Sequence, residues 1–280
     1  MNDLHLCIDK VKRSMIKSYP TYKQSILLLL IWLLCTLLSV LLVIPFFSAE
    51  SGIGLSLMYT VSMLLTVIAG LFLRGYWRFK TSSFSVVVIL ISIFSILSWH
   101  IVLEPLQYII PISKTVLRMF KDLQNQPYAF FFMVVVVAPI FEEALFRGII
   151  LDGFLKNYKP WHGIFASACL FALIHGNLAQ GISAFALGIL FGWIYWKTNS
   201  IIPCILLHFI NNLIAFVGTS TSTEEDFNKS LRESMSNDTA YGILYAFSIA
   251  IAIGSVWVIH EKYFSKLGTT RNAAGLTPDG

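Results

Sequence analysis

The sequence predicts an all-α protein, a polytopic membrane bundle of about eight transmembrane helices with a polar cavity inside the membrane. Of its 280 residues, 56% are hydrophobic and 12% are charged, whereas a soluble domain carries about 25% charged residues. The apolar residues are concentrated in long runs, and a helix needs about 20 such residues to cross a bilayer. Composition therefore leaves little sequence for a soluble domain.

Eight apolar runs are the candidate membrane helices. In chain order they are residues 25–47, 53–73, 84–103, 128–151, 161–174, 181–196, 201–218 and 241–258. The fifth to seventh runs are shorter than a perpendicular crossing needs. We expect them to tilt, to extend past these limits, or to enclose a polar cavity.

Polar segments separate these runs. Residues 1–24 are basic and are predicted to be a cytoplasmic segment, followed by one membrane-embedded domain over 25–260. Residues 152–160 are predicted to be a loop. Residues 261–280 end in Gly, Thr and Pro and are predicted to be a disordered cytoplasmic tail.

The distribution of Lys and Arg predicts the orientation in the membrane. Basic residues follow the second, fourth and sixth runs and occur in both terminal segments, whereas the links after the first and fifth runs have none. Cytoplasmic loops carry the excess of Lys and Arg, so both termini are predicted to be cytoplasmic. The net charge of +5 is explained by this asymmetry, and we expect no nucleic-acid partner.

Charged residues interrupt the fourth run within residues 138–148. Glu142, Glu143 and Arg147 lie there in otherwise apolar sequence, although a charge in hydrocarbon costs about 2.5–3.5 kcal/mol on insertion scales. Glu143 and Arg147 are four residues apart and can pair on one helix face. Glu142 is rotated by about 100° from Glu143 and is left free. This pattern indicates a functional site.

Three further polar residues interrupt apolar runs. His175 ends the fifth run, while His208 and Asn212 lie one turn apart on the seventh. Counted from the cytoplasmic helix ends at 1.5 Å per residue, Glu142 lies roughly 15 Å deep, His175 roughly 18 Å and His208 roughly 10 Å. These residues are therefore expected to meet in one cavity.

The side chains in this set suit hydrolysis of an acyl bond, above all a peptide bond. A carboxylate beside an imidazole can activate water, and a second imidazole with an amide can stabilise an oxyanion. Glu and His are also ordinary zinc ligands. The cofactor prediction is therefore either none or a divalent metal, which Glu142, His175 and His208 would hold.

The three motifs, in this order on apolar helices, resemble the CPBP family of CAAX-type prenyl endopeptidases and bacteriocin-processing proteins, also called the Abi family. The motifs are Glu-Glu-x-x-x-Arg, Phe-x-x-x-His and His-x-x-x-Asn. The linking sequences His175-Gly176-Asn177 and Thr198-Asn199-Ser200-Ile201-Ile202-Pro203 match as well. The resemblance covers residues 128–218.

The resemblance implies roles for individual residues. Glu142 would activate water with the help of His175, and His208 with Asn212 would stabilise the oxyanion. The family is described both as metalloproteases and as metal-free glutamate proteases, and we favour the second mechanism.

Glu143 and Arg147 would form a structural ion pair at the site. The implied substrate is a membrane-associated peptide or protein, and the implied location is a bacterial cell membrane. The resemblance leaves the oligomeric state undetermined.

Other hypotheses explain part of the pattern. A non-enzymatic membrane partner, such as a bacteriocin-immunity or signalling scaffold, could use the same fold to bind a peptide. A proton-coupled transporter would also place Glu and His in the membrane, but the chain lacks the internal repeats that many transporters show. The charged residues could also form a packing network without chemistry.

Overall fold

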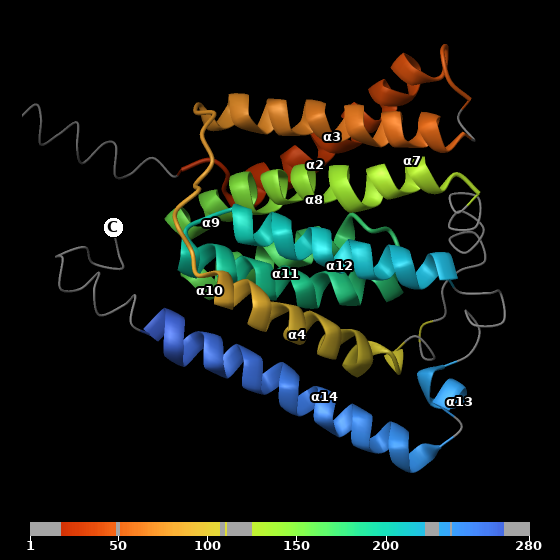
Figure 1. Cartoon of the computed structure of the whole chain (residues 1–280). Coiled ribbons are helices and arrows are strands. Elements are labelled where there is room, and N and C mark those ends of the chain that lie inside the picture. Colours follow the sequence, from red (N-terminus) through yellow and green to blue (C-terminus); the bar gives the residue numbers. More distant parts are fainter. Residues whose placement is uncertain are drawn as a thin grey trace, which may run out of the picture.

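The computed structural model describes residues 18–48, 51–106, 110, 125–221, 230–235 and 237–265. Within these ranges the chain is a bundle of helices (Figure 1), and its β structure is limited to an isolated bridge between Thr81 and Ser200. Most of the predicted terminal segments 1–24 and 261–280 lies outside the described residues. The helices are α2 (Tyr22–Val43), α3 (Gly52–Arg74), α4 (Val86–Leu103), α7 (Pro127–Phe131), η1 (Phe132–Val137), α8 (Ala138–Glu143), η2 (Ala144–Leu151), α9 (Asp152–Asn157), α10 (Pro160–Leu173), α11 (Leu178–Thr198), α12 (Ile202–Thr221), α13 (Leu231–Met235), α14 (Asp238–Ile259) and η4 (His260–Phe264).

The predicted helical membrane bundle is confirmed, with one difference in the number of spans. In the described ranges, seven helices are long and apolar enough to cross a membrane. The fifth predicted span corresponds to α10, which has 14 residues and is therefore about 21 Å long. Pro160 opens this helix, and Gly176, with φ of 68°, follows its last turn. These two residues make α10 shorter than the roughly 30 Å hydrocarbon core.

One continuous helix of 31 residues, Pro127–Asn157, forms the centre of the bundle. It comprises α7, η1, α8, η2 and α9, of which η1 and η2 are π-helical. The predicted loop at 152–160 was wrong at its start, because the helix continues to Asn157. Asp152 is 2% exposed and pairs with Lys80 and Lys156, so this polar residue lies inside the protein rather than in a loop.

The other helices surround this central helix. In Figure 1, α2 and α3 lie on one side of it, and α10, α11 and α12 on the other. α3 runs parallel to the central helix, while α4 and α14 pack on each other at the far edge. The central helix is the most buried of the seven candidate spans, and all eight residues of η2 are buried.

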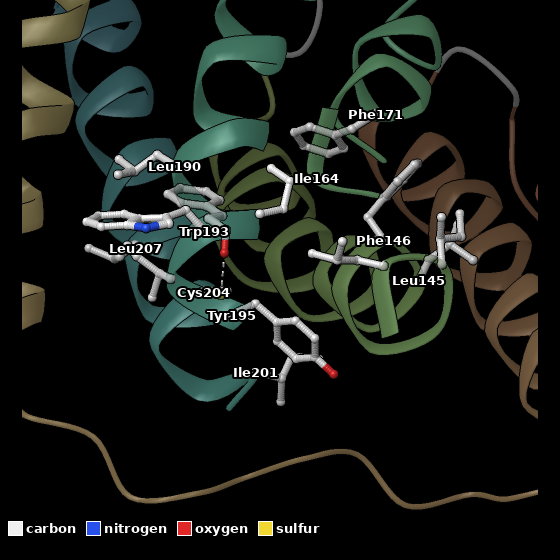
Figure 2. Packing of buried hydrophobic residues seen from close by; sticks show 14 of the residues in the cluster. Leu145, Phe146, Ile164, Phe171, Leu190, Trp193, Tyr195, Ile201, Cys204 and Leu207 are labelled. Atoms are coloured by element: carbon white, nitrogen blue, oxygen red, sulfur yellow. Dashed lines mark hydrogen bonds between the residues drawn. The ribbon is translucent and has the colours of Figure 1, made fainter. Parts of the chain in front are cut away.

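The hydrophobic core joins the central helix to α10, α11 and α12. Figure 2 shows Leu145 and Phe146 beside Phe171 of α10, whose ring centroid lies 5.0 Å from that of Phe146. Cys204 of α12 packs in the same core and donates its thiol to the carbonyl of Phe191. This packing joins η2 to α10 and α11 to α12, while α8 contacts α12, which carries the histidine of the third motif, directly.

Both ends of the described chain lie at the same end of the bundle. Ser18 exchanges hydrogen bonds with the side chain of Asn157 at the end of the central helix. Phe264 packs on Trp193 near the end of α11, with ring centroids 4.8 Å apart. The seven candidate spans and the shorter α10 together make an even number of helices along the bundle, which brings both described ends to the same end of it.

Candidate active site

Glu142 and Glu143 lie in the middle of the central helix, at the end of α8 and between the two π-helical segments. Glu143 is fully buried, and Glu142 is 9% exposed. π-helical turns are rare and are frequent at functional sites. The two carboxylates therefore lie at mid-span, where an unpartnered charge is most costly.

Glu143 joins the first and third motifs. Its Oε1 accepts a hydrogen bond of 2.7 Å from Arg147 Nη1 and one of 2.8 Å from His208 Nδ1. The guanidinium of Arg147 also stacks on Phe171, 4.7 Å from the ring centroid. Glu143 and Arg147 thus form a buried ion pair that also orients the imidazole of His208.

Glu142 has two neighbours on other helices. Its Oε2 lies 3.8 Å from His208 Nε2, which is longer than a direct hydrogen bond. Its Oε1 accepts a hydrogen bond of 2.5 Å from the hydroxyl of Tyr59 on α3. The structure therefore brings Glu142 and His208 together, as the sequence analysis expected.

Asn212 lies one turn beyond His208 on α12 and binds the backbone of the central helix. Its Nδ2 donates a hydrogen bond of 2.8 Å to the carbonyl of Val134 in η1. Its Oδ1 accepts from Asn211, whose own Oδ1 lies 3.1 Å from His100 Nε2 on α4. The amide of Asn212 is thus held by a polar chain across three helices.

His175 lies beside the site but makes no hydrogen bond or ion pair with Glu142 in the described part of the chain. Its Nδ1 donates to the carbonyl of Phe171 at 2.8 Å, which leaves Nε2 as the acceptor in the neutral ring. The Phe171 ring packs edge-on against both imidazoles, with centroids 5.0 Å from His175 and 5.9 Å from His208. Cooperation of His175 with Glu142 stays a prediction.

The donor set gives limited support for a bound metal. Among the described residues, no group of three His, Cys, Asp or Glu side chains is arranged to hold an ion. A catalytic zinc site uses three protein ligands, whereas of the three predicted ligands, Glu142, His175 and His208, only Glu142 and His208 form a close pair in the described part of the chain. The described residues do not fit a zinc site in this arrangement.

Sequence reasoning missed Tyr59, and it did not include Asn211 or His100 among the site residues. Tyr59 occurs in the interior of an apolar run, away from the membrane interfaces where tyrosines concentrate. A tyrosine in the interior of a predicted membrane helix could therefore have been identified as a candidate site residue. Asn211 was not among the predicted site residues, but its amide donates a hydrogen bond of 2.9 Å to that of Asn212. Which polar residue reaches a neighbouring helix depends on helix rotation, which spacing along one helix does not determine.

Comparison with protein families gives a match over part of the chain. Residues 124–214 match the family model described as type II CAAX prenyl endopeptidase Rce1-like. This segment contains all seven specified residues of the three motifs. No curated protein and no solved structure matches the chain.

Proposed function

We propose that this chain, whose residues 124–214 match the type II CAAX prenyl endopeptidase Rce1-like family model, is an intramembrane endopeptidase that cleaves membrane-associated peptides with water activated by Glu142. The family match supports a protease acting within the membrane. The observation that carries the residue assignment is the pairing of Glu142 with an imidazole that Glu143 orients.

Charge balance in the bundle supports an acid–base role for Glu142 and His208. Glu143 and Arg147 cancel each other, because they form a buried ion pair. Glu142 and His208 have no net charge either as carboxylate with imidazolium or as carboxylic acid with neutral imidazole. Burial in a low dielectric favours such a combination, in which one titrating proton is held by the pair. Either the carboxyl or the imidazole can hold that proton, so the pair can accept and return it.

The reaction then proceeds by general base catalysis. With the shared proton on His208, Oε2 of Glu142 takes a proton from a water, and the resulting hydroxide attacks the peptide carbonyl carbon. His208 Nε2–H donates to the oxyanion of the tetrahedral intermediate, as does the second amide hydrogen of Asn212. Collapse of the intermediate breaks the C–N bond, and the proton held by Glu142 passes to the leaving amine.

His175 is proposed to assist by accepting a hydrogen bond from the attacking water. Its Nδ1–H is engaged by the carbonyl of Phe171, so the lone pair of Nε2 is free for this contact. The Phe171 ring, which packs on both imidazoles, would hold them at a constant separation.

The direct test is Glu142→Gln, which removes the base while conserving shape. The purified protein is reconstituted in liposomes with a set of membrane-anchored fluorogenic peptides, including a farnesylated CAAX peptide and its unprenylated counterpart. We expect kcat to fall by about 10²–10⁴, the usual contribution of a general base. Glu261→Gln, at an exposed position, is the matched control and should cleave normally.

A folded Glu142→Gln protein that cleaves at the normal rate would refute the role of Glu142. Tight binding of peptides without cleavage by the unmodified protein would instead favour the non-enzymatic hypothesis. Metal analysis of active protein, with activity measured after chelation, completes the test. We expect activity to persist after chelation. If chelation abolishes activity and one added metal restores it, a metal-dependent mechanism replaces the metal-free one.

A further inference from the structure

Tyr59 contacts the proposed catalytic carboxylate from outside the segment that matches the family. It lies on α3, whereas the matched residues begin at 124. Its hydroxyl donates to Oε1 of Glu142 at 2.5 Å, which is within the short range of O–H···O⁻ bonds. The site therefore includes a residue from a helix that carries none of the three motifs.

Other contacts hold α3 in place without this hydrogen bond. At its start, the Gly52 N–H donates to Gln126 Oε1 at 2.6 Å, and Ser56 Oγ donates to the carbonyl of Ala129 at 3.0 Å. At its end, Arg74 donates to the carbonyl of Gly148. Because α3 is anchored at both ends, the bond from Tyr59 is not needed to dock the helix.

The bond determines which oxygen of Glu142 is available for chemistry. A carboxylate rotates readily about its last torsion, and either oxygen could turn toward α12. With Oε1 engaged by the phenol, Oε2 is the oxygen that faces His208 Nε2 at 3.8 Å. The two neighbours thus hold the carboxylate from opposite sides.

We propose that Tyr59 is a positioning residue for Glu142: its hydroxyl holds Oε1, so that Oε2 is presented to the attacking water and to His208. The proposal rests on the proposed function, because it assigns Tyr59 a role in the same reaction. It predicts a defect in turnover rather than in binding, since Tyr59 acts through Glu142.

The contact is tested first by a thermal-unfolding cycle that needs no activity. Tyr59→Phe is measured in the unmodified protein and in a Glu142→Ala background, in detergent. We expect it to lower the melting temperature in the first case and to leave it unchanged or higher in the second, where the hydroxyl has already lost its acceptor. An equal decrease in both backgrounds would overturn the proposal and assign Tyr59 to packing.

Glu142→Gln provides a second background if Glu142→Ala does not fold. An amide oxygen accepts a weaker hydrogen bond than a carboxylate, so the effect of Tyr59→Phe should be reduced there. An undiminished effect would again overturn the proposal. The matched control is Tyr19→Phe, because the buried hydroxyl of Tyr19 has no hydrogen-bond partner within the described ranges.

The role is tested next by kinetics on the peptide that the unmodified protein cleaves best. We expect Tyr59→Phe to lower kcat by about 10- to 100-fold, the cost of misplacing a catalytic group, with KM changed by less than about twofold. Tyr19→Phe should change neither. A normal kcat for Tyr59→Phe would overturn the proposal. If the unfolding cycle shows coupling between Tyr59 and Glu142 but the unmodified protein cleaves no peptide, the proposed function is refuted and the hydrogen bond between the two residues remains established.

Discussion

At the scale of single residues, Glu143 links the charges of the site. One of its oxygens accepts hydrogen bonds from both Arg147 and His208. Glu143 and Arg147 are 0% and 1% exposed, so neither charge has access to solvent. Removing one partner would leave an uncompensated charge in the interior, which is more costly than removing both.

We therefore expect Arg147→Met to destabilise the protein by about 3–5 kcal/mol, as when one partner of a buried pair is removed. The double variant Glu143→Gln/Arg147→Met should be less destabilised than Arg147→Met alone, because no charge is then unpaired. The measurement is thermal unfolding of purified protein in detergent.

Arg232→Gln is the control for this comparison, because its ion pair with Asp238 is exposed to solvent and such pairs contribute little. Additive losses in the double variant would show that Glu143 and Arg147 are not energetically coupled in the folded protein.

At the scale of the helix, Pro139 and Asn212 together explain the π-helical turn before the two carboxylates. The N–H of Ala138 donates to the carbonyl of Met133, five residues back. In the same register the carbonyl of Val134 would need the N–H of residue 139, which proline lacks. Asn212 donates to this carbonyl instead, so α12 supplies the bond that the central helix cannot make.

Replacing Asn212 with Leu should cost about 1–3 kcal/mol, the penalty for an unsatisfied buried backbone group. Adding Pro139→Ala should recover part of this loss, because residue 139 then has an N–H to donate to Val134. Thermal unfolding of the single and double variants measures the recovery. If Pro139→Ala lowers stability equally in the unmodified protein and in the Asn212→Leu background, the compensation does not occur.

At the scale of the whole molecule, Asp152 ties several segments at the end of the bundle where the termini lie. It accepts hydrogen bonds from Tyr76 at 2.7 Å and from Tyr195 of α11 at 3.2 Å. Lys80 and Lys156 form ion pairs with it at 2.8 and 2.7 Å. A single carboxylate therefore connects the segment after α3, the central helix and α11.

Asp152→Asn should lower stability by about 1–3 kcal/mol, with the lysine contribution discounted because both lysines are partly exposed to solvent. Activity should change by less than about twofold, since Asp152 lies ten residues, or about 15 Å, along the helix from Glu142. Thermal unfolding and peptide cleavage measure the two effects.

Asp238→Asn, which alters an exposed ion pair, should change neither stability nor activity. Loss of cleavage by a stable Asp152→Asn protein would show that the two ends of the central helix are coupled.

Much of the fold was predictable because the bilayer constrains the sequence directly. Helices are required where backbone groups cannot bond to water, so apolar runs revealed the membrane-spanning helices and most of their limits. The pairing of Glu143 with Arg147 was also predictable, since both lie on one helix with a four-residue spacing. The burial of Asp152 was not, because apart from Lys156 its partners Tyr76, Lys80 and Tyr195 lie far away in the sequence.

By itself, the sequence determined that the chain is a helical membrane protein and where its intramembrane charges lie, because both follow from the cost of polar groups in hydrocarbon. Only the tertiary structure decided which groups meet: His208 with Glu143, Tyr59 with Glu142, and Asn212 with Val134. Each of these contacts joins two helices, and their relative rotation and depth arise from packing that no single helix encodes.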